Sequence, residues 1–238
     1  MSILRYLYIG AVWVGLMMAA AARADEIPDP RMISVRAVNA TGTGCQSGQV
    51  SSVVAPDGSA FSVMFDHYES IAGGGGVRVD KKACEIDVEM AVPSGWSFTL
   101  FTADYRGFAN VDAGATGFHE VVYTFDRPGS SPQGPPVNPH NGSPVQRTGN
   151  FSFSTKEFRG PFTGDYSIHN ELSVQNLAWS PCDTTTTKTL HMSTSLLTRV
   201  LGADNRPHVQ MSLDSVDGAL AQQFGIKWRR CEIGRAHV

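Results

Sequence analysis

Apolar and polar side chains alternate along much of the chain, most clearly in residues 84–92. The even-numbered positions of this stretch are apolar, and three odd-numbered positions, Glu85, Asp87 and Glu89, are acidic. Because successive side chains of a β-strand point to opposite faces, the stretch predicts a strand with one buried face and one wet face. Pro93-Ser94-Gly95 then predicts a turn, and the alternating residues 96–100 predict the second strand of a hairpin.

Further candidate strands share this short, alternating character and are separated by turn residues. They cover residues 33–38, 50–55, 61–65, 121–125, 151–154, 166–172, 190–197, 209–213 and 224–228. We find no stretch with the 3.6-residue apolar stripe and the end caps of a helix. The pattern predicts an all-β chain folded as an antiparallel β-sandwich of jelly-roll or immunoglobulin-like type, with a closed barrel as the alternative.

Residues 127–149 interrupt this rhythm with repeated Pro, Gly, Ser and Asn. Such a segment is either a linker between two small domains or a long loop inserted in one domain. We favour a Pro-rich loop within a single domain over residues 25–231, because the sheets of a sandwich usually combine strands from both halves of a chain.

Both ends of the chain carry segments that we exclude from this domain. Arg5 precedes an uncharged run over residues 6–22, and Ala22-Arg23-Ala24 fits the small-residue pattern of a cleavage site. We therefore expect residues 1–24 to be a signal peptide, with an uncleaved membrane anchor as the alternative. Residues 232–238 correspond to one reading frame of a common sequencing adapter and are a suspected artefact.

Composition narrows the possible partners and the compartment. The chain has 19 Lys and Arg against 22 Asp and Glu, a formal net charge of −3, which offers no reason to expect a nucleic-acid partner. Export implies a secreted, extracellular or periplasmic protein with no membrane span after cleavage of the signal. Extracellular carbohydrate or protein remains as the expected partner.

Four cysteines in an exported chain suggest two disulfides, for which three pairings exist. We favour Cys45–Cys84 and Cys182–Cys231, because each pair lies on its own side of the Pro-rich segment. No CxxC motif and no His beside a Cys at zinc spacing occurs, so we expect neither a metal site nor a cofactor.

Short motifs rich in Gly, Trp and Cys follow one another along the chain. They are Gly42-Thr43-Gly44-Cys45, Cys84 ahead of Pro93-Ser94-Gly95-Trp96, Asp104-Tyr105-Arg106-Gly107-Phe108-Ala109, Gly160-Pro161-Phe162 with Gly164-Asp165-Tyr166, Trp179-Ser180-Pro181-Cys182 and Trp228-Arg229-Arg230-Cys231. In this order they resemble the secreted bacterial and fungal family catalogued as domain of unknown function 4360, over nearly all of residues 33–231. The resemblance implies a secreted, β-rich, cysteine-containing domain without an established activity, in which the Pro-rich stretch is a variable loop.

Catalytic motifs are absent from the sequence. No GxSxG motif occurs, and His119-Glu120 begins an HExxH pattern that lacks its second His and lies in a predicted strand. We therefore name no catalytic residue.

Asp104, Tyr105 and Arg106 are the candidate binding residues. A carboxylate, an aromatic ring and a planar guanidinium together can bind sugar hydroxyls or a carboxylate. The alternative is structural, with Asp104 and Arg106 pairing at a strand end and Tyr105 packed in the core.

These observations favour a non-enzymatic extracellular or envelope-associated module that binds carbohydrate or protein. One alternative is a polysaccharide-acting hydrolase with Asp104 and Asp112 as its carboxylate pair. Another is a secreted inhibitor or effector that presents the Pro-rich loop. Whether the protein is an enzyme stays open at this point.

Overall fold

A computed structural model of the chain describes residues 27–46, 48–125, 151–171, 177–204, 206–213 and 222–231. The expected signal peptide, the whole Pro-rich segment and the suspected C-terminal artefact lie outside these residues. The regular secondary structure of the described residues consists of β-strands and one short 3-10 helix, η1 (Pro30–Met32). Within it, no helix has the length and apolarity that a membrane crossing requires.

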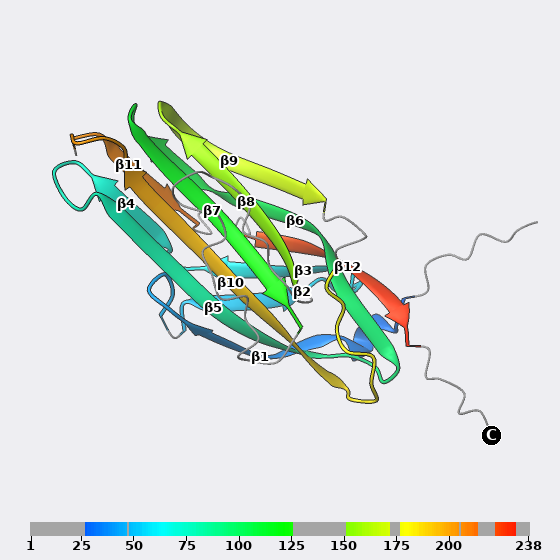
Figure 1. Cartoon of the computed structure of the whole chain (residues 1–238). Helices are drawn as coiled ribbons and strands as arrows, with labels where there is room; N and C mark the ends of the chain where they lie inside the picture. The colour runs from blue at the N-terminus through cyan, green and yellow to red at the C-terminus, as the bar shows by residue number, and fades with distance from the viewer. Residues whose placement is uncertain are drawn as a thin grey trace, which may run out of the picture.

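The described strands form two antiparallel sheets that pack as a sandwich (Figure 1). The five-stranded sheet contains, in hydrogen-bonded order, β1 (Ser34–Thr41), β5 (Val79–Ala91), β10 (Thr187–Val200), β7 (Ala115–Thr124) and β8 (Phe151–Arg159). The seven-stranded sheet contains, in order, β2 (Val50–Val54), β3 (Ala60–Phe65), β12 (Gln222–Arg230), β6 (Trp96–Val111), β11 (His208–Ser212) and β4 (Glu69–Gly73), with β9 (Phe162–Glu171) paired to β6.

The predicted antiparallel sandwich is confirmed, and because the described strands form two separate sheets with open edges, the alternative of a closed barrel is wrong. Several strands are longer than the alternation indicated. For example, β5 begins at Val79 rather than at Cys84, and β6 continues to Val111. The short strand β4 was not predicted at all. Each sheet contains strands from both sides of the segment 126–150.

The 16-residue strand β6 organises the seven-stranded sheet. One of its edges pairs with β12 over residues 96–105 and then with β11 over residues 108–111. Its other edge pairs with β9 over residues 102–111. β12 and β11 therefore lie end to end along one side of β6, and Gly107 lies at the junction between them. A Cβ atom on Gly107 would lie 2.1 Å from the carbonyl oxygen of Ser212, so the close approach of β11 requires glycine here.

A β-bulge divides β6 into two halves of opposite phase. Up to Leu100 the side chains that join the core are even-numbered, and from Ala103 onward they are odd-numbered. The register with β12 shifts between Gly225 and Ile226, which leaves Phe101 without a partner on that strand. An extra residue of this kind interrupts the ladder locally and reverses which side chains face the core beyond it.

Two disulfides close at separate places in the fold, Cys45 to Cys84 on β5 and Cys182 to Cys231. This is the pairing that the sequence favoured. The second bridge ties the residue after β12 to the segment 177–182, which runs beside the start of β6. There the Ser180 amide donates to the Phe98 carbonyl at 2.8 Å, and the Thr99 hydroxyl donates to the Ala178 carbonyl at 2.6 Å.

His119 is a buried titratable group in the core between the sheets. Its ring lies edge-on to Tyr105 at 5.0 Å between centroids, and its Nε2 has no hydrogen-bond partner among the described residues. Burial lowers the pKa of His119 to about 3, so the imidazole stays neutral in the folded protein near neutral pH.

We predict that His119 makes the protein sensitive to acid. Its pKa in the fold lies below the unfolded value of 6.5, so the fold is favoured above pH 6.5 and loses stability as the pH falls towards 3. The loss attributable to His119 is about 1.4 kcal/mol per pH unit at most. Urea unfolding across this window should show that His119→Phe has a shallower pH dependence than the wild type. Parallel curves for the two proteins would contradict the assignment.

Candidate functional site

The structure separates the three candidate binding residues of β6. Tyr105 is 2% exposed and packs edge-on against His119 and Phe224, whereas Asp104 and Arg106 lie on the outer face of the seven-stranded sheet. Neighbouring residues of a strand point to opposite faces, so one ligand cannot contact all three side chains from outside. Tyr105 therefore belongs to the core, which is the structural alternative weighed for it above.

Asp104 pairs with a histidine rather than with Arg106. Its Oδ1 lies 2.7 Å from Nδ1 of His169 on β9, and the register places these two residues opposite each other. The hydrogen bond to Asp104 raises the pKa of His169. This exposed pair is a feature of the sheet surface.

The proposed catalytic carboxylates Asp104 and Asp112 do not meet. They are separated by eight positions along the continuous pairing of β6 with β9, which corresponds to about 26 Å. Asp112 instead accepts a hydrogen bond at 2.8 Å from the backbone amide of His208. Carboxylate pairs in glycosidases lie within about 10 Å of each other, so this pair is excluded as a hydrolytic centre.

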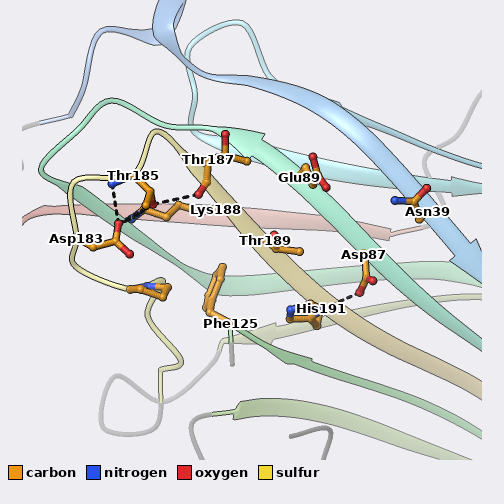
Figure 2. A pocket seen from close by; sticks show the side chains of 11 residues that line it. Asn39, Asp87, Glu89, Phe125, Asp183, Thr185, Thr187, Lys188, Thr189 and His191 are labelled. Atoms are coloured by element: carbon orange, nitrogen blue, oxygen red, sulfur yellow. Dashed lines mark hydrogen bonds and ion pairs between the residues drawn. The ribbon is translucent and has the colours of Figure 1, made fainter. Parts of the chain in front are cut away.

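A hollow of about 330 Å³ on the outer face of the five-stranded sheet is the better candidate site (Figure 2). This volume lies at the small end of the range that ligand pockets occupy. Strands β1, β5 and β10 and the loop before β10 form it, with Phe125 after β7. Its lining consists of Asn39, Asp87, Glu89, Phe125, Pro181, Asp183, Thr185, Thr187, Lys188, Thr189 and His191.

The register of three strands brings one polar row into the hollow. Asn39 on β1 lies opposite Asp87 on β5, and Asp87 lies opposite His191 on β10. Nδ1 of His191 is 2.6 Å from Oδ1 of Asp87, as Figure 2 shows. The imidazole is 13% exposed and the carboxylate 47% exposed, so this hydrogen bond positions Asp87 while the carboxylate remains accessible to a ligand.

Lys188 and Asp183 form a fixed charged group at one end of the hollow. The Lys188 side chain is 1% exposed, and its ammonium donates to Asp183 Oδ1 and, at 3.1 Å, to the Thr185 hydroxyl. The hydrogen bond from Lys188, together with those from Thr185, lowers the pKa of Asp183. Asp183 is thus held ionised in a set geometry beside the hollow.

Glu89 lies on the same face of β5 as Asp87, two residues further along the strand. It is half-buried, and no hydrogen bond or ion pair joins its carboxylate to any other described residue. Its oxygens can therefore accept hydrogen bonds from a bound ligand. Pro181 and the small exposed part of Phe125, a core residue that is 5% exposed, add apolar surface. The hollow therefore combines hydrogen-bond acceptors and threonine hydroxyls with a limited apolar wall.

The arrangement offers no cation-binding geometry in the part of the chain that the structure describes, where no group of three or more His, Cys, Asp or Glu side chains could hold a metal ion. His119 and Glu120, which begin the HExxH-like pattern, lie on β7, and His119 is buried.

Sequence reasoning found only part of this site. The alternation around Asp87 and Glu89 correctly placed both on the wet face of a strand. Nothing local linked them to Asn39 or His191, which are distant in sequence and come together through strand register. A sequence signal for the β10 part of the site does exist. Thr187, Thr189 and His191 alternate with buried residues along β10, which places their side chains together on the outer face.

Comparison with known proteins agrees with the motif pattern. A family model described as Domain of unknown function (DUF4360) matches residues 31–231. An "Uncharacterized secreted protein" of Arthroderma benhamiae is 29% identical over 205 residues, which cover 86% of this chain and 74% of that protein. Among solved structures, TmCBM61 in complex with β-1,4-galactotriose covers 81% of this chain and 88% of its own, at 10% identity and a TM-score of 0.24. So low a TM-score supports no argument about fold or ligand.

Proposed function

The chain is a secreted member of the family described as domain of unknown function 4360, and from that premise we propose that it acts as a non-catalytic extracellular binding module. The two disulfides agree with this compartment. The observation that carries the proposal is the hollow on the five-stranded sheet, where positioned and unpaired carboxylates stand beside an aromatic side chain.

A neutral saccharide is the ligand class that this lining fits best. Sugar hydroxyls donate hydrogen bonds to carboxylates, and they can both donate hydrogen bonds to threonine hydroxyls and accept them. The C–H face of a sugar ring packs on aromatic and apolar surface. Asp87 and Glu89 supply the acceptors, and Thr189 supplies a hydroxyl. Pro181 supplies apolar surface, together with the small exposed part of Phe125, which is 5% exposed and packs against Phe98 in the core. Specific polar groups on a partly apolar wall are typical of small-ligand sites.

We predict that replacing the carboxylates of the hollow with neutral amides weakens saccharide binding. On an array of neutral oligosaccharides, and in titrations of the best-bound one, Asp87→Asn and Glu89→Gln should each lower the affinity about tenfold. Asp104→Asn is the matched control, since Asp104 pairs with His169 at 2.7 Å much as Asp87 pairs with His191 at 2.6 Å, but on the opposite sheet. If Asp104→Asn abolished binding and the hollow variants did not, the site would lie on the other face.

A polysaccharide-acting hydrolase is the second candidate, favoured by one observation. Asp87 and Glu89 share a face of β5 two residues apart, or about 7 Å. That separation lies within the range of glycosidase carboxylate pairs. In the hydrolase hypothesis, Asp87 and Glu89 in the hollow therefore replace Asp104 and Asp112 as the carboxylate pair.

Incubation of the purified protein with the bound oligosaccharide separates the two candidates. We expect no release of new reducing ends, because in our proposal the hollow binds the saccharide without cleaving it. Steady release that Glu89→Gln abolishes would instead establish hydrolysis and contradict a purely binding role. The inhibitor or effector hypothesis concerns the Pro-rich segment, which lies outside the described residues.

We also propose that residues 1–24 are the export signal, as the sequence pattern indicates. Mass spectrometry of protein collected from the medium should find Asp25 as the first residue. Ala24→Phe, which removes the small residue before the cut, should slow processing. Recovery of the secreted protein with residues 1–24 still attached would contradict this boundary.

A further inference from the structure

Two cations of β12 lie over aromatic rings on the outer face of the seven-stranded sheet. The Lys227 ammonium is 4.9 Å from the centroid of the Phe101 ring, and the Arg229 guanidinium is 4.1 Å from that of Trp179. Both cations belong to exposed residues, and both aromatic residues are half-buried. The bulge in β6 presents Phe101 here, and the segment 177–180 beside β6 presents Trp179.

The backbone fixes the relative positions of the two pairs. Lys227 and Arg229 are two residues apart on β12, opposite Thr99 and Ser97 of β6. Because positions two apart on a strand share a face, the two cations project side by side, about 7 Å apart at their Cα atoms. A cation held over an aromatic ring loses less conformational freedom when it binds an anion, since its side chain is already ordered.

Neither cation has a carboxylate partner among the described residues. Other exposed arginines do: Arg31 pairs with Asp29, Arg159 with Glu157 and Arg206 with Asp204. A neighbouring carboxylate on this face is Glu171, which lies across β6 from Gly225, but no ion pair joins it to Lys227 or Arg229. On a chain with a formal net charge of −3, this surface therefore stands out as locally positive.

Desolvation of the Arg229 guanidinium by the groups around it adds to the affinity of this surface for an anion. The pKa of Arg229 is lowered by desolvation, which means that its charge is less well solvated than that of a free arginine. An anionic group in contact with the guanidinium would restore that stabilisation.

We propose that Lys227 and Arg229, with Phe101 and Trp179 beside them, form a second binding site that takes an acidic polysaccharide. Carboxylate or sulfate groups of the polymer accept hydrogen bonds from the guanidinium and the ammonium. The exposed parts of the two rings pack against the C–H faces of the sugars. This site lies on the sheet opposite the hollow and does not depend on the function proposed for the hollow.

Four soluble polymers test the proposal by affinity electrophoresis and biolayer interferometry. Polygalacturonate presents carboxylates on sugars, dextran sulfate presents sulfates on sugars, dextran is neutral, and poly-L-glutamate presents carboxylates without sugars. We expect retention on the first two, none on dextran, and weaker retention on poly-L-glutamate. Comparison of the first two arms shows which acid group is preferred. Added salt should weaken binding, because it screens charges on an exposed surface.

Lys227→Gln and Arg229→Gln should each reduce the affinity for the acidic polysaccharides about tenfold. Arg206→Gln removes the same charge from an arginine paired with Asp204 at 2.8 Å and should leave the affinity unchanged. Asp87→Asn in the hollow should also leave it unchanged, so the failure of one site is distinguishable from the failure of the other.

Arg229→Gln also removes a contact within the fold, because the Arg229 guanidinium lies 4.1 Å from the centroid of the Trp179 ring. Arg229→Lys keeps the charge, and Lys227→Gln changes an exposed side chain, so these two variants together with thermal unfolding keep the test decisive. Three results would overturn the proposal: no more retention on acidic polysaccharides than on dextran, equal retention on poly-L-glutamate, or unchanged affinity in folded Lys227→Gln and Arg229→Gln.

Discussion

The sandwich depends on the pairing and burial of β6. This strand has hydrogen-bonding partners along both edges, and its inner face supplies Trp96, Phe98 and Leu100 to the core before the bulge and Ala103 and Tyr105 after it. A buried strand with unpaired backbone groups would lose the free energy of each missing hydrogen bond. This requirement fixes the positions of three neighbours of β6: β12, the short strand β11 and the segment 177–180. It thereby also fixes the outer surfaces that these neighbours present.

Several residues of the motifs that carry the family resemblance have structural roles in this fold. Cys182 and Cys231 close a disulfide beside the start of β6, and the Trp228 indole donates to the Gly58 carbonyl at 3.0 Å. Gly44 leaves room for the Tyr68 ring, and Gly107 leaves room for β11. The motifs thus describe how the sandwich is held together. They say little about what it binds, which agrees with the general observation that sandwiches carry many different functions.

The two sheets offer contrasting outer surfaces. The five-stranded sheet carries the hollow, with Asp87 and Glu89 as acceptors and the buried Lys188 neutralising Asp183. The seven-stranded sheet carries Lys227 and Arg229 over aromatic rings.

The sequence alone determined the strand character and the outward direction of Asp87 and Glu89, because a period of two is a local property of the strand. It favoured a sandwich, but the sheet topology was needed to exclude a closed barrel. It could not determine the phase of β6. Continuing the alternation from Trp96, Phe98 and Leu100 would turn Asp104 and Arg106 inward and Tyr105 outward, whereas the bulge at Phe101 does the reverse. Nor could it place Asn39 and His191 beside Asp87. Bulges and strand register are decided by the packing of strands that are distant in the chain, and only the tertiary structure contains that information.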